Sequence, residues 1–355
     1  MGKLFYQYQE AFCELLNEKN IRIDSAEQID KVIQKSLPET SKILFERLIK
    51  DSGEMLQEHS YIRSEFEARL NRRWMKPLNL LEMLIVMNTE VGEEFAQQFE
   101  DTNWDSHKFN VLYRIHTRAC QISYEILALL RSGFPDGAFA RWRTLHELAV
   151  LAFFIFDHDE TLALKYLEYE AIENYREMEE YQKKCRRLGF EPLSKKEVSG
   201  IKRERERLIV KYGEEFAKEY GWTSEILPKW KRSFKGMEEK VNLQHLHPFY
   251  KMACNQIHSG PKGNSMSLAL MGEKDRTNFF LSGASNYGLA DPGQNTAISL
   301  IQIATCLTML NPTIDKMMII KTMEIVGEKI SHQFVDVQME IEEEEAKEQN
   351  GSVTV

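Results

Sequence analysis

The sequence predicts an all-α fold, a multi-helix bundle with a protruding charged helical hairpin and a long Gly/Ser-rich loop. Apolar residues recur with helical spacing in one segment after another, and few alternating strands are credible before residue 260. Residues 149–156 are apolar on every side, which is typical of a helix packed on all faces. A hydrophobic content of 43% in 355 residues is enough for a sizeable core.

Four helices are expected in the N-terminal part, over residues 1–20, 25–38, 40–74 and 77–99. Ser25 and Gln28 would form a capping box at the start of the second helix, and Pro38 would end it. This part holds no cluster of catalytic residue types at useful spacing. We therefore interpret residues 1–105 as a helical scaffold.

A central helical bundle is expected over residues 106–335. Its helices are predicted at 111–131, 138–156, 161–187, 194–220, 248–260, 291–310 and from 313 onward, with the long loop at 265–290. Gly133 and Pro135 mark a short turn, which makes the first two helices antiparallel neighbours. Ser194 and Glu197 cap a returning helix, so residues of about 161–220 form the inserted hairpin.

Charge is concentrated in two segments. The C-terminal tail, residues 336–355, has seven acidic residues and one Lys and so carries most of the net charge of -9. We expect this tail to be disordered. Residues 183–211 hold eleven Lys or Arg against four Glu, which suits either phosphate binding or a solvated helix face. Interleaved Glu favours the solvated face. If a partner protein binds, we expect it at this basic hairpin segment or at the acidic tail.

Several classes of protein are excluded by the composition. No run approaches the ~18 apolar residues that span a bilayer, so no membrane association is expected, and cytoplasmic localisation is the default. The five cysteines are scattered without a CxxC pair, which argues against a zinc knuckle, a redox motif or a disulfide framework. No cofactor is expected.

Ionisable residues enter the best-buried helix in its first half, at Arg141, Arg143, His146 and Glu147. Buried charge is costly unless it is paired, so each of these residues needs a partner or a function. Arg143 and Glu147 are spaced i,i+4, and Glu125 at the end of the preceding helix is a candidate partner for Arg141 or Arg143. These residues either brace the bundle as internal salt bridges or line a polar cleft.

A second informative helix places Tyr250, Cys254 and His258 on one face, at i, i+4 and i+8. His258 lies at the helix C-terminus, where the macrodipole favours a protonated ring, and Asn255 is one turn behind it. The best functional interpretation makes His258 a general acid or base opposite Arg141.

Three alternatives stay open for this helix. One is a zinc site formed by His245, His247, Cys254 and His258, although the spacing of paired zinc ligands is lacking. Another is Cys254 as a nucleophile with His258 as its base. The third is structural, a helix terminus capped by its own histidine.

These two helices carry a resemblance. The segments EILALLRSGFPDGAFARWRTLHELAVLAFFI and FYKMACNQIHSG resemble a bacterial family known only as a domain of unknown function, over most of residues 60–310. In that family a Gly, an Ala, an Arg and a Glu recur in the central helix and a Tyr-x3-Ser-x3-His helix follows. The matching residues are Gly133, Ala138, Arg141 or Arg143, Glu147, Tyr250 and His258, with Cys254 in place of the Ser.

More distantly, the two helices are similar to the HEPN superfamily of helical bundles. Many of its members are metal-independent ribonucleases or toxins of phage defence, in which an R-x4-6-H motif cleaves RNA through the 2'-hydroxyl. Here the span from Asn255 to His258 is shorter than that motif, whereas Arg141 and His146 have its spacing but lie in the central helix. The resemblance also implies a homodimer.

Two functions follow as hypotheses. In the first, a HEPN-like protein binds RNA or a nucleotide in a polar cleft, with His258, Arg141 and Tyr250 as catalytic residues. Arg143, Glu147 and Asn255 would bind the ligand. In the second, the protein is a non-catalytic helical adaptor or structural protein in which the same residues form an internal ion network.

Overall fold

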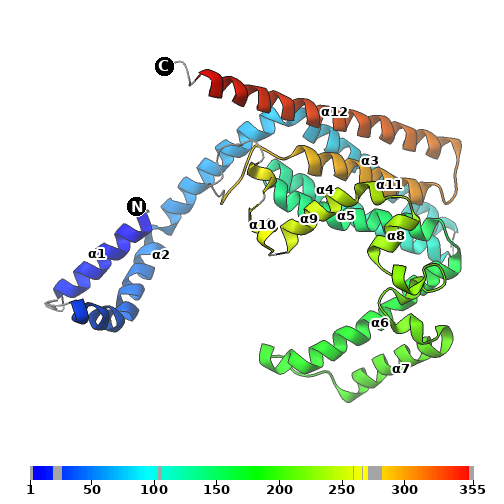
Figure 1. Ribbon diagram of the computed structural model, residues 1–355, viewed down its shortest axis with the longest axis horizontal. Coiled ribbons are helices and arrows are strands. Elements are labelled where there is room, and N and C mark those ends of the chain that lie inside the picture. Colours follow the sequence, from blue (N-terminus) through cyan, green and yellow to red (C-terminus); the bar gives the residue numbers. More distant parts are fainter. Residues whose placement is uncertain are drawn as a thin grey trace. The chain divides into compact units, whose positions relative to one another are not determined.

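A computed structural model describes residues 3–18, 26–102, 106–258, 260–265, 267–270 and 282–351 (Figure 1). Within these residues the chain forms helices and short 3-10 turns and no strand, which confirms the all-α prediction. The predicted cap at Ser25 and the middle of the Gly/Ser-rich loop, 271–281, lie outside the described residues. None of the described helices is long and apolar enough to cross a membrane.

The chain divides into two compact units, residues 1–69 and 70–355. The division therefore does not fall at residue 105, where the sequence analysis places it. The reason is that helix α3 (Met75–Thr102) packs against α4 (His107–Arg131) and α12 (Ile314–Gly351). Helix α3 thus belongs to the central bundle and not to an N-terminal scaffold.

The first unit contains α1 (Lys3–Glu18) and most of α2 (Ala26–Arg73). Ala11 and Leu15 of α1 are buried. The expectation that Pro38 ends a helix is wrong, because α2 continues through it. A proline removes one backbone hydrogen bond, and at this exposed position the freed carbonyl can bond to water instead.

Five long helices form the core of the second unit. They are α3, α4, α5 (Pro135–Phe156), α11 (Ala290–Thr308) and α12. Helices α4 and α5 pack against one another across the turn at Gly133, whose positive φ of 78° suits glycine. Helix α11 packs against the other four. Its small buried residues, such as Ala297 and Ala304, let the neighbouring helices approach closely.

Trp142 of α5 and Gly293 of α11 show how tightly this core is packed. The Trp142 side chain is fully buried, and its indole N–H donates to the Asn295 carbonyl at 2.9 Å and to the Ser299 hydroxyl at 3.1 Å. A Cβ atom at Gly293 would lie 2.3 Å from the ring of Phe334 on α12. Any larger residue at this α11–α12 contact therefore requires a shift of the Phe334 ring or of one helix.

The C-terminal tail differs from the expectation, because α12 is helical as far as Gly351. Arg73 forms an ion pair with Glu344 at 2.6 Å, and the Tyr287 hydroxyl donates to Glu345. Ile341 is buried as well. These contacts extend the packed part of α12 into the acidic segment for which disorder was predicted.

The charged hairpin is formed by α6 (Glu160–Lys184) and α7 (Lys195–Tyr212), which extend away from the five-helix core in Figure 1. The predicted capping box of Ser194 and Glu197 is present. Helix α7 ends eight residues earlier than predicted, because Gly213 adopts a positive φ of 86°.

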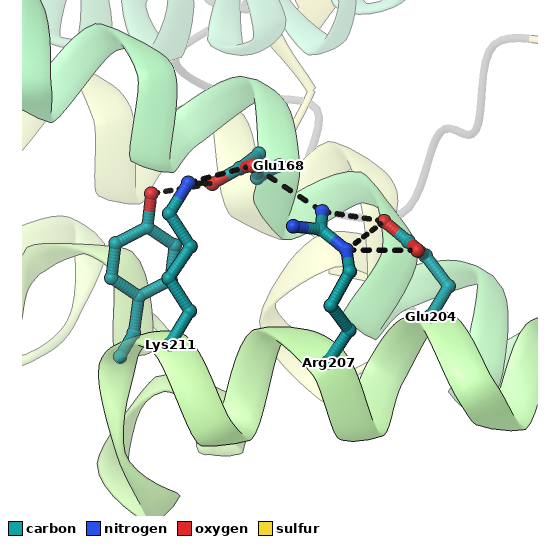
Figure 2. A network of polar contacts seen from close by, with 5 residues as sticks. Glu168, Glu204, Arg207 and Lys211 are labelled. Atoms are coloured by element: carbon teal, nitrogen blue, oxygen red, sulfur yellow. Dashed lines mark hydrogen bonds and ion pairs between the residues drawn. The ribbon is translucent and has the colours of Figure 1, made fainter.

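Ion pairs join the two hairpin helices, as Figure 2 shows. Glu168 of α6 accepts hydrogen bonds from Lys211 at 2.9 Å and from the Tyr212 hydroxyl, and Arg207 lies 3.4 Å from the same carboxylate. Arg207 also bonds to Glu204 at 2.7 Å. Part of the basic charge of segment 183–211 is thus neutralised within the hairpin.

Short elements lie between the two hairpin helices and between the hairpin and α11. These are the 3-10 turns η1 (Cys185–Leu188), η2 (Glu214–Ala217), η3 (Gly221–Thr223), η4 (Lys229–Lys231), η5 (Gln244–Leu246) and η6 (Leu268–Leu270), and the helices α8 (Phe234–Lys240), α9 (His247–Ile257) and α10 (Pro261–Ser265). Helices α8 and α9 both pack against α5. This packing brings their polar side chains to the first half of α5.

Candidate functional site

The candidate site is a polar cluster where α5, α8 and α9 meet. Helix α5 contributes Arg143, His146 and Glu147, whose i,i+3 and i,i+4 spacing directs them to one side of the helix. Tyr250 comes from the first turn of α9, which Pro248 starts. We call this set, together with Glu238 of α8 and His247 of α9, the Glu238 cluster.

Arg143, Glu147 and Tyr250 form one half of the Glu238 cluster. The Arg143 Nη2 atom lies 2.9 Å from Glu147 Oε1, and the Tyr250 hydroxyl donates to the same oxygen at 2.7 Å. The guanidinium carbon of Arg143 lies 5.2 Å from the centre of the Tyr250 ring, within cation-π range.

The surroundings of these three groups shift their pKa values. Burial raises the pKa of Tyr250, and its hydrogen bond to Glu147 raises it further. Burial opposes the charge of Arg143, but the hydrogen bond with Tyr250 and the charge of Glu147 outweigh it and raise the pKa of Arg143. Tyr250 is therefore a neutral donor and Arg143 a permanent cation at physiological pH.

Glu238 links two histidines in the other half of the cluster. Its side chain is fully buried, with Oε1 2.9 Å from His146 Nε2 and Oε2 2.6 Å from His247 Nδ1. A buried carboxylate needs such donors to compensate for the loss of water. Each histidine can meet this need by donating a ring N–H to it.

His146 is the enclosed member of this pair. Its side chain is fully buried, and its ring stacks on Trp142 at 5.4 Å between centroids. Burial lowers the pKa of His146, although the hydrogen bond with Glu238 opposes this shift. A neutral ring that donates through Nε2 leaves Nδ1 as an acceptor, and this buried atom has no partner among the described residues.

His247 is the accessible member. It begins α9, its side chain is 23% exposed, and its ring stacks on Tyr250 at 5.8 Å between centroids. If Nδ1–H donates to Glu238, the lone pair is on Nε2, and no described residue bonds to that atom. A carboxylate that fixes the tautomer of a histidine and leaves Nε2 free is the arrangement that general bases use.

The predicted catalytic residues Arg141 and His258 lie outside the Glu238 cluster. Arg141 bonds to Glu125 on α4, one of the two pairings that the sequence analysis named. His258 is exposed and caps the C-terminal end of α9, roughly 16 Å along the helix from His247. No contact between Arg141 and His258 is found among the described residues. Asn255, between the two ends of α9, forms no side-chain hydrogen bond with the described residues of the cluster either.

Of the six predicted site residues, the structure brings together Arg143, Glu147 and Tyr250. Sequence reasoning missed Glu238 and considered His247 only as a zinc ligand. No periodic pattern joins these two residues to the central helix. The available signal was the segment SFKGMEEK, in which a serine caps a short helix. A second helix follows, with His247 as its first residue and Pro248 as its second.

Metal binding finds no support in the part of the chain that the structure describes. No group of three or more His, Cys, Asp or Glu side chains there is arranged to hold a metal ion. All five cysteines are free thiols, and Cys254 is half-buried on α9.

The fold and the site define an all-α bundle with a buried Glu–His network at its central helix. Residues 109–277, somewhat less than half of the chain, match a family described as "Family of unknown function (DUF5677)". The matched range includes every residue of the Glu238 cluster. No curated protein and no solved structure was found to match the chain.

Proposed function

We propose that the Glu238 cluster is a metal-independent acid–base site that acts on a phosphodiester, with RNA as the first candidate substrate. The observation that carries the proposal is the bond of 2.6 Å between Glu238 Oε2 and His247 Nδ1, which leaves Nε2 of a partly exposed imidazole free to exchange a proton. RNA as substrate rests on the HEPN resemblance of the sequence.

In the proposed reaction, His247 Nε2 accepts the proton of a ribose 2'-hydroxyl. The 2'-oxygen attacks the adjacent phosphorus, the bond from phosphorus to the 5'-oxygen breaks, and the leaving 5'-oxygen takes a proton from solvent or from the imidazolium. Glu238 stabilises that imidazolium. The products are a 2',3'-cyclic phosphate and a 5'-hydroxyl.

Arg143 would stabilise the charge that develops on the phosphate oxygens. The Arg143 side chain is 25% exposed, and its guanidinium group has five N–H donors. Glu147 pairs with one of its nitrogen atoms, Nη2. Tyr250 contacts both active groups, since His247 stacks on its ring and the Arg143 guanidinium lies 5.2 Å from the ring centre. Tyr250 would position both groups and is not itself required to transfer a proton.

The experiment incubates the full chain with total RNA in EDTA and analyses the ends of the products. We expect cleavage with cyclic phosphate ends, and a loss of about 100-fold or more in rate for His247→Ala. His245→Ala is the matched control, because His245 is exposed, lies two residues away and does not contact Glu238. Absence of cleavage by the unaltered chain, or full activity of His247→Ala, would refute the proposal.

A second candidate is the non-catalytic adaptor, and the pairing of Arg143 with Glu147 favours it. This pairing neutralises a cation that a phosphate would otherwise attract. Under this candidate His247→Ala and Arg143→Ala lower the melting temperature, and the unaltered chain cleaves no RNA. The adaptor would meet its partner protein through the hairpin or the acidic end of α12.

A further inference from the structure

A cavity lies between α4 and α6, and its lining shares no residue with the Glu238 cluster. The volume of the cavity is about 270 Å³. Its lining includes three aromatic side chains, Tyr166 and Tyr169 of α6 and Trp222 of η3. This volume is at the lower end of the range of small-molecule sites. A ligand that fills it is smaller than a typical drug.

The aromatic side chains are held in place by their own contacts. Tyr166 and Trp222 meet edge to face, with 5.1 Å between ring centroids. Trp222 in turn packs edge to face against Phe154 of the core, at 5.6 Å. The Tyr169 hydroxyl donates to the Lys218 carbonyl at 2.6 Å. The cavity is thus preformed, which reduces the entropy that a ligand must lose there.

The remaining polar side chains of the lining are Arg114, Glu170 and Glu173, all exposed at the surface. None of the three forms a hydrogen bond or an ion pair with another residue in the part of the chain that the structure describes. Two carboxylates and one guanidinium thus line the cavity, and the guanidinium of Arg176 lies 5.8 Å from the centre of the Tyr169 ring. An unpaired carboxylate next to a π face attracts cations.

Glu173 is the lining carboxylate whose charged form a bound cation would stabilise most. Although this side chain is exposed, the protein around it partly desolvates its carboxyl group and raises its pKa. Arg176 acts in the opposite direction, and the neighbouring carboxylates of Glu177 and Glu170 raise the pKa further. A positive group in the cavity would relieve both the desolvation and the repulsion.

We propose that this cavity binds a small organic ammonium ion with an apolar body. The apolar body occupies the cavity and packs against Tyr166 and Trp222, and the ammonium group bonds to Glu173 at the rim. Arg114 in the lining can pair with an anionic substituent such as the carboxylate of an amino acid. The site therefore suits both simple amines and amino acids, and in each case the ammonium group bonds to Glu173. The proposal is independent of the RNA cleavage proposed above.

The test measures binding of 2-phenylethylammonium to the full chain by calorimetry and by quenching of tryptophan fluorescence, with 2-phenylethanol and phenylacetate as the neutral and anionic analogues. We expect the ammonium compound to bind about tenfold more tightly than the alcohol, and phenylacetate to bind less well than either. The quenching should decrease in Trp222→Phe.

Glu173→Gln should weaken binding of the ammonium compound about tenfold, whereas Glu177→Gln, an exposed position outside the lining one turn further along α6, should leave it almost unchanged. Both side chains are exposed, so neither variant should fail to fold. No saturable binding, equal binding of the alcohol, tighter binding of phenylacetate, or equal effects of the two variants would each overturn the proposal.

Discussion

Glu238 and Glu168 are both carboxylates held by more than one donor, but their surroundings differ. Glu238 is fully buried between two histidines, whereas Glu168 on the hairpin has a side chain that is 18% exposed and faces Lys211 and Arg207 across the surface. In the interior, loss of one partner leaves a polar group without water. At the surface, solvent replaces the missing partner at once. The contribution of each network to the free energy of unfolding therefore depends on its burial and not on its number of hydrogen bonds.

The largest expected effect comes from Glu238→Ala. The substitution removes the hydrogen-bond partner of the fully buried His146 and of His247, and it should lower the free energy of unfolding by about 4 kcal/mol. Urea unfolding followed by circular dichroism gives this value. The control is Glu239→Ala, because the side chain of the neighbouring Glu239 is 36% exposed and pairs with Lys231. Equal losses for the two variants would contradict the comparison.

A second prediction uses the buried His116 and the pH dependence of stability. Burial lowers the pKa of His116 to about 4, from 6.5. Below pH 6.5 His116 becomes protonated in the unfolded chain, whereas in the folded chain it stays neutral until about pH 4. The free energy of unfolding should therefore decrease as the pH is lowered from 6.5 to about 4, and His116 should account for about 3 kcal/mol of that decrease.

The measurement compares free energies of unfolding at pH 7 and pH 4.5 in the unaltered chain and in His116→Leu. His146 has a lowered pKa as well and adds to the loss in both proteins. The variant should lose the contribution of His116 and retain the contributions of His146 and of the carboxylates whose pKa values are lowered, such as Glu168. An unchanged pH dependence in His116→Leu would show that the buried imidazole is not responsible.

Trp142→Phe should cost about 2 kcal/mol. The variant keeps an aromatic ring but loses the indole N–H that donates to Asn295 and Ser299, and it leaves a small cavity in the core. Thermal unfolding measures the loss. Trp230→Phe is the matched control, because Trp230 is 83% exposed and should change stability by less than about 0.5 kcal/mol.

The smallest effect is expected in the hairpin. Lys211→Ala should lower the free energy of unfolding by less than about 1 kcal/mol, since the Lys211 side chain is 40% exposed. A double-mutant cycle with Glu168→Gln isolates the pair, and its coupling energy should decrease when salt is added. A coupling energy that is large and independent of salt would show that the Glu168 network behaves like the buried Glu238 cluster, which would contradict the comparison.

The two networks were predictable to different degrees. Ser194, Glu197 and the basic run that includes Arg207 and Lys211 are close in sequence, so the capped, charged helix follows from local spacing alone. In the site, spacing also predicted the pair of Arg143 and Glu147, because i,i+4 neighbours meet on any helix.

The remaining part of the site depends on contacts that are remote in sequence. His146 and Glu238 are 92 residues apart, and Glu147 and Tyr250 are 103 residues apart. The sequence paired Arg141 with His258 across the cleft, but Arg141 bonds to α4 and His258 lies at the far end of α9. Which face of α9 meets α5, and at which turn, is set by packing and not by spacing.

The sequence by itself determined that the chain is helical, where the central turn lies and which segment carries the surface charge. These features depend on periodicity, caps and breakers within a few residues. Only the tertiary structure decided that α3 joins the core, that α12 orders the acidic end of the chain, and that Glu238 lies between two histidines. Such choices depend on side-chain fit between distant helices, which no local pattern encodes.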